Sequence, residues 1–301
     1  MYQKAYGIIE TLAPLHVGAS AGEETGNLNL IFRDQFTQTG IIPGSSIRGR
    51  FRADMRSIDT TDNNLDYGLT NDCYGHESKN NDPESTTEAQ VKFEYASLVW
   101  LPVFCPGQPV VWVTCPRLLR RYKQVAQLEY ELPKHYTVQL QKPCRTLFFN
   151  LGHLTGLRNV KKTDIDNLEQ WIPETKNLNF APNNLVVVGD NDINIIHEMS
   201  LYRQSRTKLE DDVKKVKNFF GVEALPEGSI LAFPVAIKQK NKERNETEWE
   251  EALGYTQWEK KPSDTQKHIL SKELYFGGLE SIGFGRCHVT LAGEYFNQGD
   301  K

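Results

Sequence analysis

The sequence lacks the signatures of several large classes of protein. No apolar run approaches the roughly 20 residues that a membrane-spanning helix needs, and the N-terminus lacks the charged-then-apolar layout of a secretion signal. The five cysteines are scattered and form no CxxC or CxxH pair, so neither a zinc site nor a disulfide framework is indicated. We therefore expect a cytoplasmic protein with reduced thiols, no resident metal and no membrane partner.

Common catalytic motifs and an excess of positive charge are also missing. The chain contains no GxxxxGK(S/T) phosphate loop, no GxSxG and no HExxH motif. It has 35 Lys and Arg residues against 39 Asp and Glu residues, which gives a net charge of −4 at pH 7. A nucleic-acid surface would therefore have to come from local clusters of cations, not from overall charge.

The composition is globular, with 39% hydrophobic residues in a chain of 301. Apolar runs bounded by Gly and Pro predict strands at 5–12, 96–116 (a hairpin), 185–188, 228–237 and 288–291, and helices are expected at 45–56, 117–132 and, from its alternating charges, 203–217. Polar stretches at 57–92 and 238–272 are expected to be insertions in a single domain spanning 1–301. The expected fold class is α+β, with one antiparallel sheet and helices on one of its faces.

The clearest local element is the predicted helix at 45–56. Ser45 or Ser46 suits its N-cap. Apolar residues spaced by four form one face and arginines form a stripe beside it: Ile47, Phe51 and Met55 on the first, Arg48, Arg52 and Arg56 on the second, with Arg50 as a further cation. A second basic cluster follows at 117–123.

The start of the predicted helix 45–56 has the features of a phosphate-binding site. Its free N–H groups, serine hydroxyls and arginines all favour an anion. Gly49 costs about 1 kcal/mol relative to Ala inside a helix, which makes sense if a ligand approaches the backbone there. The same pattern also fits an ordinary amphipathic helix with a solvated basic face.

A second candidate binding element is the glycine-rich segment 277–286. Its glycines let a ligand approach the backbone, and its last residue adds a cation: Gly277, Gly278, Gly283, Gly285 and Arg286. It is not GxGxxG, so a dinucleotide site is not indicated, and alone it equally suits a long turn. Together with the helix at 45–56 it favours a polyanion such as RNA. His16 follows a predicted strand and suits an acid–base group, an RNA contact or a structural histidine.

The block 15–52 resembles the N-terminal signature of the RAMP superfamily of CRISPR proteins. That signature consists of His-x-Gly, a glycine-containing loop, an Arg-Asp pair and Ile-Pro-Gly-Ser-Ser-x-Arg-Gly-x-x-Arg, found here at His16–Gly18, Arg33–Asp34 and 42–52. The segment 277–286 resembles the family's C-terminal glycine-rich loop. Segments 98–121 and 219–235 are similar to the backbone subunit of the Cmr (type III-B) complex, with the Csm-type subunit as a near neighbour.

The resemblance implies a modified ferredoxin-like (RRM-like) palm with an antiparallel sheet, plus finger and thumb insertions. The implied partners are CRISPR RNA, target RNA, other subunits of a type III complex, and neighbouring copies or paralogous backbone subunits. The residues expected to hold RNA are Ser45, Ser46, Arg48, Arg50, Arg52, Gly277, Gly278, Gly283, Gly285 and Arg286. The glycine-rich loop is expected to pack beside the arginines.

The resemblance also bears on catalysis. In active members, an Asp in the loop before the Arg-Asp pair supports target cleavage by attack of a 2′-OH, aided by a divalent metal such as Mg²⁺ or Mn²⁺. Here Asn29 holds that place, or Leu28 if the alignment shifts by one, and neither is an anionic base. The remaining catalytic candidates are His16, Asp34 and Glu223, with Glu23 and Glu24 upstream in the loop.

We therefore expect an RNA-binding subunit of a type III antiviral effector complex whose cleavage activity is weak or lost. One alternative is an active, metal-dependent endoribonuclease of the same fold, using one of the remaining carboxylates. The other is a structural subunit that binds no RNA, in which the basic helix contacts an acidic partner protein.

Overall fold

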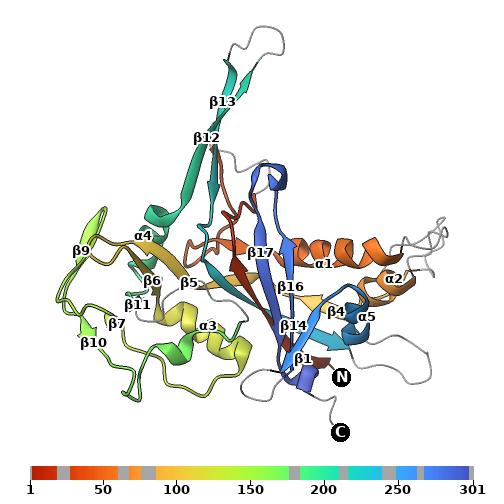
Figure 1. Cartoon of the computed structure of the whole chain (residues 1–301), viewed down its shortest axis with the longest axis horizontal. Coiled ribbons are helices and arrows are strands. Elements are labelled where there is room, and N and C mark those ends of the chain that lie inside the picture. Colours follow the sequence, from red (N-terminus) through yellow and green to blue (C-terminus); the bar gives the residue numbers. More distant parts are fainter. Residues whose placement is uncertain are drawn as a thin grey trace.

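The structure is a computed structural model that describes residues 2–18, 28–59, 68–75, 86–175, 184–209, 216–238, 249–262 and 268–297. Its centre is a 12-stranded sheet (Figure 1). In spatial order the main path contains β10 (Arg158–Asn159), β7 (Thr137–Leu140), β11 (Asn184–Val187), β6 (Val110–Thr114), β5 (Ala96–Phe104), β14 (Ile230–Lys238), β1 (Tyr2–Thr11), β17 (Arg286–Ala292), β16 (His268–Tyr275) and β15 (Glu259–Pro262). Off this path, β3 (Ile41–Ile42) pairs with β5, and β4 (Val91–Phe93) pairs with β14.

Most neighbouring strands of the sheet are antiparallel, as expected, and the parallel pairs are β7–β10 and β6–β11. Two smaller sheets accompany it. One pairs β8 (Leu147–Phe149) with β9 (Gly152–Leu154), and the other orders β12 (Tyr202–Leu209), β13 (Val216–Ala224) and β2 (Leu28–Asn29). The expectation of a mixed fold built on a large antiparallel sheet is confirmed.

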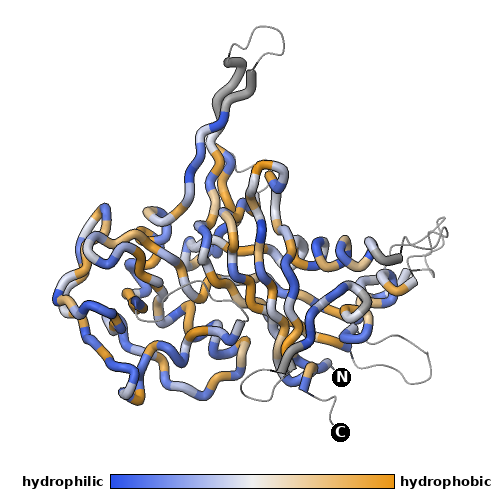
Figure 2. The backbone as a smooth tube through the Cα atoms, in the orientation of Figure 1, coloured by the Kyte–Doolittle hydropathy of each residue, from blue (hydrophilic) through white to orange (hydrophobic). Residues whose placement is uncertain are grey.

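Helices cover both faces of the central sheet. Ile8 and Ile9 are consecutive in β1 and both buried, so they project to opposite sides. The face that Ile9 joins is covered by α1 (Gly44–Asp59), α2 (Gly68–Tyr74), α4 (Ile193–Ser200) and α5 (Trp249–Tyr255). The face that Ile8 joins is covered by α3 (Pro116–Ala126), through Leu119 and Tyr122. The expectation of helices on one face was wrong, because consecutive residues of the central strands are buried on both sides; these strands are largely hydrophobic (Figure 2).

The predicted helix at 45–56 is present as α1, with its apolar residues Ile47, Phe51 and Met55 buried. It begins earlier than expected. The carbonyl of Pro43 accepts the backbone N–H groups of Ser46 (3.0 Å) and Ile47 (3.1 Å). Ser45 and Ser46 therefore lie in the first turn and do not cap it.

The predicted helix at 117–132 ends at Ala126. The next residue, Gln127, adopts a left-handed conformation with φ of 55°, and its N–H bonds to the carbonyl of Lys123. This arrangement stops a helix by satisfying one of its last carbonyls. Shorter 3₁₀ turns occur at Glu169–Trp171, Glu280–Ile282 and Glu294–Asn297.

The predicted helix at 203–217 was wrong, because the described part of this segment is extended. β12 and β13 pair antiparallel, with Arg203 opposite Glu223, and form a hairpin that projects from the body of the protein (Figure 1). Much of β12 is hydrophilic (Figure 2). A strand that leaves the core has no apolar face to bury, so its sequence shows charge alternation without the apolar signal of a strand.

The described parts of 57–92 and 238–272 contain regular elements that pack around α1. Arg48 of α1 donates to the backbone carbonyl of Tyr74, and the Phe51 ring lies 6.1 Å from that of Trp249 and 5.3 Å from that of Trp258, centroid to centroid. Trp249 Nε1 donates a hydrogen bond to the Tyr74 hydroxyl (3.1 Å). These parts therefore complete the core on the α1 face. That the two stretches are insertions stays a prediction.

None of the helices in the described ranges is long and apolar enough to cross a membrane. All five cysteines carry free thiols, and all except Cys144 are buried. Burial raises the pKa of the Cys115 thiol to about 12, which leaves it protonated and unreactive at neutral pH.

Candidate functional site

Three of the catalytic candidates meet at the base of the β12–β13 hairpin. Strand β2 runs parallel to β13 and places Asn29 opposite Val222, next to Glu223. His16 follows β1 and donates from Nδ1 to the backbone carbonyl of Glu223 (2.6 Å). The structure therefore brings His16, Asn29 and Glu223 together, although they come from distant parts of the chain.

A network of four charged groups holds this base together, and we call it the hairpin clamp: Arg33, Glu198, Arg203 and Glu223. Arg33 donates to Oε2 of Glu198 (2.6 Å) and to Oε2 of Glu223 (2.8 Å). Arg203 donates to Oε1 of Glu223 (3.2 Å) and also to Glu198. The clamp ties the segment after β2, helix α4 and both strands of the hairpin to one another.

The clamp is electrically balanced, with two arginines and two glutamates. Burial opposes ionisation of Glu198, but the hydrogen bond and charge of Arg33 outweigh it and lower the pKa of that carboxyl. The Glu223 side chain is 0% exposed, and both of its oxygens accept from arginine. It is therefore committed to an ion pair, an arrangement that fits a structural role better than that of a general base.

His197 lies directly beside the clamp on α4 and is fully buried. Its Nε2 accepts the backbone N–H of Gly40 (2.9 Å), so the neutral ring carries its proton on Nδ1. Burial, followed by the positive charge of Arg33, lowers the pKa of His197 to about 3. Sequence reasoning missed this residue, and its only local signal was a histidine among the apolar residues of 193–199.

Asp34 has a local structural role. Its Oδ1 accepts hydrogen bonds from the N–H of Phe36 (3.0 Å), the N–H of Thr37 (2.8 Å) and the hydroxyl of Thr37 (2.9 Å). Burial opposes its ionisation, but these hydrogen bonds outweigh burial and lower the pKa of the Asp34 carboxyl. Through Oδ1 the carboxylate thus holds the turn after Arg33 in shape.

The described residues around Asn29 do not fit a divalent metal site. No group of three His, Cys, Asp or Glu side chains in the described ranges could hold an ion. Both oxygens of Glu223 and Oδ1 of Asp34 accept hydrogen bonds, and Asn29 offers only a neutral amide. Glu23 and Glu24 lie outside the described residues.

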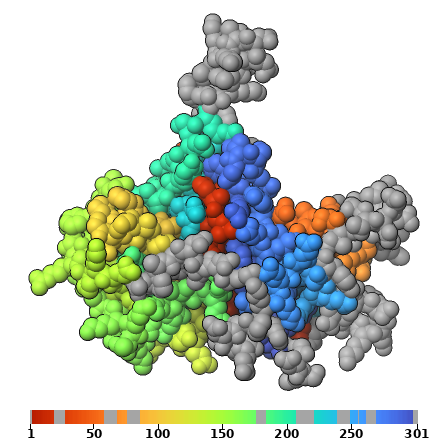
Figure 3. All heavy atoms as spheres, viewed as in Figure 1, coloured from red at the N-terminus to blue at the C-terminus, as the bar shows by residue number. Residues whose placement is uncertain are grey.

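The glycine-rich loop packs against the chain after β1. Gly278 donates its N–H to the carbonyl of His16 (3.1 Å), and Gly285 donates to the carbonyl of Pro14 (2.9 Å). The ring of Phe284 is buried in a small cluster with Val222 and Ala224 of the hairpin. Figure 3 shows this C-terminal segment, in blue, beside the hairpin base, in teal.

We expected this loop to pack beside the α1 arginines, but in the described residues it contacts other parts of the chain. The hydrogen bonds described for residues 277–286 go to the segment after β1, to the loop itself and to the neighbouring strand, and none reaches α1. Arg286 forms an exposed ion pair with Glu273 across the β16–β17 ladder (3.0 Å). The close approach that the glycines permit is with the protein's own backbone.

Gly277→Ala is expected to destabilise the protein by at least about 2 kcal/mol. Gly277 has φ of 76°, and an added Cβ would lie 2.0 Å from the carbonyl oxygen of His16. The matched control is Gly278→Ala, where an added Cβ meets nothing within 4 Å; we expect a change below about 1 kcal/mol there. Urea unfolding of both variants measures the difference, and equal losses would contradict the packing described here.

The α1 arginines have different surroundings. Arg48 donates to the backbone carbonyl of Tyr74 and so links α1 to α2. Arg50 is half-buried, and its Nε has no hydrogen-bond partner among the described residues. Gly49 is exposed, and a Cβ added there would meet nothing within 4 Å. The surface over Gly49 is thus open to a ligand, whereas Arg48 is engaged in the fold.

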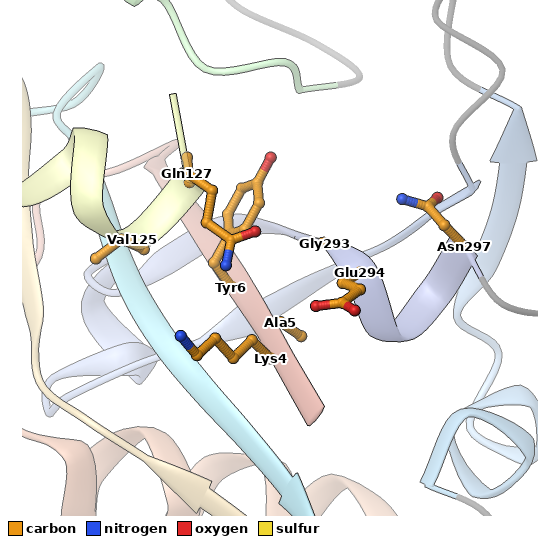
Figure 4. A pocket seen from close by; sticks show the side chains of 9 residues that line it. Lys4, Ala5, Tyr6, Val125, Gln127, Gly293, Glu294 and Asn297 are labelled. Atoms are coloured by element: carbon orange, nitrogen blue, oxygen red, sulfur yellow. The ribbon is translucent and has the colours of Figure 1, made fainter. Parts of the chain in front are cut away.

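A pocket of about 300 Å³ lies elsewhere, at the far end of β1 from His16. Figure 4 shows its mixed lining, which includes Lys4, Tyr6, Gln127 and Glu294. None of the residues predicted to bind RNA or to catalyse lines this pocket. The candidate site is therefore the hairpin base with the adjoining surface, not this cavity.

Comparisons with protein families, curated proteins and solved structures show what this chain is similar to. The family model described as the RAMP superfamily matches residues 8–288. A search of curated proteins found no match. A cryo-EM structure of the Type III-B Cmr-beta bound to cognate target RNA is similar to this chain, with a TM-score of 0.66, 18% identity, and coverage of 96% of this chain and 97% of that one.

Crystal structures show the same likeness. Oligomeric Cmr4 from Pyrococcus furiosus has a TM-score of 0.62 and 18% identity, covering 96% of this chain and 98% of its own. A further Cmr4 structure has a TM-score of 0.61 and 16% identity, covering 97% of this chain and 99% of its own. At these identities the likeness establishes the fold, and it confirms the resemblance seen in the sequence. The chain therefore belongs to the RAMP superfamily, and its fold is that of the Cmr4 and Cmr-beta structures.

Proposed function

We propose that this protein is an RNA-binding backbone subunit of a type III CRISPR effector complex, holding CRISPR RNA and target RNA. The observation that carries the proposal is the braced hairpin that projects from the palm of a RAMP-superfamily chain. The similarity to a Cmr-beta structure solved with cognate target RNA supports it. Its expected partners are other subunits of the complex and neighbouring copies or paralogous backbone subunits.

The projecting hairpin is the best candidate for the thumb. It leaves the body as two paired strands (Figure 1), and the clamp holds its base through ion pairs to the buried carboxylate of Glu223. An element that wedges a guide–target duplex must resist bending, which requires a braced base. Neither of the polar stretches 57–92 and 238–272 supplies such an element in its described part, since these parts pack around α1.

Cleavage of target RNA is proposed to be weak or lost in this protein. Asn29 stands beside Glu223, which is neutralised by Arg33 and Arg203. The carboxylate of Glu223 therefore lacks the free oxygen that base catalysis or metal binding needs. An active endoribonuclease would need Mg²⁺ or Mn²⁺ and another carboxylate, such as Asp34 or Glu24.

Gly49→Ala tests the RNA surface on α1, because the change in stability and the change in binding are expected to have opposite signs. Alanine should stabilise the helix by up to about 1 kcal/mol, since the added Cβ meets nothing within 4 Å. If the guide backbone approaches Gly49, the affinity for CRISPR RNA should fall about threefold or more, equivalent to about 0.7 kcal/mol. Thermal unfolding and RNA titration measure the two effects.

A second variant, Arg50→Gln, tests the same surface. It should weaken binding of all RNA sequences and lower the slope of log affinity against log salt by about 0.7 to 0.9. Wild-type protein that shows no salt-dependent RNA binding would overturn the proposed function. The protein would then be better described as a structural subunit without RNA.

Asn29→Asp tests the proposed loss of cleavage. The complex would be assembled with guide RNA and given matched target RNA with Mg²⁺ or Mn²⁺. We expect no regular cuts from the wild type, and regularly spaced cuts from the variant if the Asp is the missing group. Asn29→Leu is the matched control and should stay inactive. Regular cuts from the wild type would favour the active endoribonuclease, and Glu24→Gln would then be the next variant.

A further inference from the structure

Helix α3 carries four cations, and the structure divides them into two pairs. Arg121 turns inward, donating from Nε to the Ser97 hydroxyl (3.0 Å) with its guanidinium 3.9 Å from the ring centre of Tyr95. Lys123 donates to backbone carbonyls just beyond the end of the helix. Arg117 and Arg120 remain exposed. They are three residues apart, so they lie on one side of the helix.

An exposed aromatic ring stands beside this cationic pair. Phe36 is 72% exposed, and its ring centre lies 5.2 Å from the guanidinium carbon of Arg117. The turn that carries it is held by Asp34, which accepts the N–H groups of both Phe36 and Thr37. The ring is therefore presented in a fixed position, with a cation at one side.

We propose that Phe36, with Arg117 and Arg120, is a stacking site for an unpaired RNA base, and that the two arginines hold the adjoining phosphates. An exposed aromatic with nearby cations is the usual means of binding single-stranded nucleic acid, because every base has a π-face. The inference rests on the proposed function, and it adds a contact outside the α1 start and the hairpin. It also gives a role to the basic cluster at 117–123.

The surroundings of Phe36 favour RNA over a protein partner. Its exposed neighbours Gln35 and Gln38 are polar, so the ring is not part of a continuous apolar patch of the kind that forms the core of a protein interface. Other exposed apolar side chains, including Phe148, Leu151 and Ile195, gather around the β8–β9 hairpin and α4. Two acids lie nearby: Asp190 accepts the backbone N–H of Arg117 (2.9 Å), and Asp34, whose pKa Arg117 helps to lower, accepts the N–H groups of the turn that carries Phe36.

The test compares Phe36→Ala with Phe36→Tyr in the full chain, titrated with a labelled single-stranded CRISPR RNA. Loss of one stacked base corresponds to a loss in affinity of about 5- to 150-fold, so we expect at least fivefold for Phe36→Ala. Phe36→Tyr keeps the ring and should stay within about twofold of the wild type. The salt slope should not change in either variant, because no phosphate contact is removed.

Two further measurements separate the outcomes. Arg117→Gln with Arg120→Gln should lower the salt slope by up to about two. RNA containing 4-thiouridine should cross-link to the peptide that holds Phe36. If the wild type binds RNA and Phe36→Ala binds it equally well, this inference alone is overturned. If the wild type has no affinity for RNA, the proposed function is overturned as well. If Phe36→Ala kept its RNA affinity but lost self-association, the ring would be a protein contact and the inference would be wrong.

Discussion

Arg33→Met is expected to lower the free energy of unfolding by about 3 kcal/mol. Arg33 donates to Glu223 (2.8 Å), whose side chain is 0% exposed, and to Glu198 (2.6 Å). Removing the guanidinium leaves the buried carboxylate of Glu223 with Arg203 at 3.2 Å as its remaining cation and the backbone N–H of Ile31 at 3.4 Å. Methionine keeps much of the packing of the arginine stem, so the loss reports the charge and its hydrogen bonds. Urea unfolding at neutral pH measures it.

The matched control is Arg286→Met, which removes the arginine of an exposed pair with Glu273 (3.0 Å). Exposed ion pairs contribute at most about 1 kcal/mol, so this variant should stay close to the wild type. Adding Glu223→Met to Arg33→Met should recover part of the loss, because no poorly paired carboxylate then remains buried. Equal losses in the two single variants would show that the clamp does not hold the hairpin base.

The clamp also links stability to RNA binding. If the hairpin acts as a thumb, Arg33→Met should weaken target binding in the assembled complex even at temperatures where the protein stays folded. A variant that is destabilised but binds target normally would show that the hairpin direction is set elsewhere. Measuring affinity and unfolding on the same preparation distinguishes these cases.

Stability is expected to fall by about 2 kcal/mol between pH 7 and pH 5 because of His197 alone. The pKa of His197 is lowered to about 3 in the folded protein, against an ordinary value of 6.5. Between these two values the unfolded chain binds a proton that the folded protein does not bind. The free energy of unfolding therefore rises with pH through this window and falls on acidification.

The physical reason for the low pKa is visible in the structure. Burial removes the water that would solvate an imidazolium, and Arg33 adds a repelling charge. Nε2 already accepts the N–H of Gly40 (2.9 Å), so a proton added to Nε2 would point at the Gly40 N–H and break this hydrogen bond.

His197→Gln provides the test. The side-chain oxygen of glutamine can accept the same N–H but does not titrate. The stability of the variant should therefore lose this pH dependence, and its unfolding should still be measurable near pH 7.5. Chemical denaturation of both proteins at pH 7, 6 and 5 gives the slopes. Identical slopes in variant and wild type would contradict the assignment.

Several features were predictable because their signals are local. The faces of α1 follow from the spacing of Ile47, Phe51 and Met55, and the β5–β6 hairpin follows from two apolar runs around Pro106 and Gly107. The family was also predictable from local motifs, above all the Pro-Gly-Ser-Ser run and the glycines of 277–286. These patterns carry over to the structure because helix and strand periods act within a few residues.

The site was predictable only in part. His16, Asn29 and Glu223 were singled out by resemblance, and they do meet, but Glu198, Arg203 and His197 were not, because no local pattern distinguishes them from surface residues. The loop at 277–286 carries the expected glycines, yet its partner is the backbone at Pro14 and His16, not α1. Glycines in a sequence can indicate that another group lies close to the backbone, but they do not identify that group.

By itself the sequence determined the family, the fold class, the amphipathic helix and the replacement of the expected Asp by Asn29. Only the tertiary structure decided that the described residues of 203–217 belong to the paired strands β12 and β13, and that Arg33 pairs with residues 165 and 190 positions away along the chain. Pairings across such separations depend on how the whole sheet closes, and a charged strand outside the core carries no apolar period to reveal it. That is why the brace of the hairpin became visible only when β2, α4, β12 and β13 were placed together.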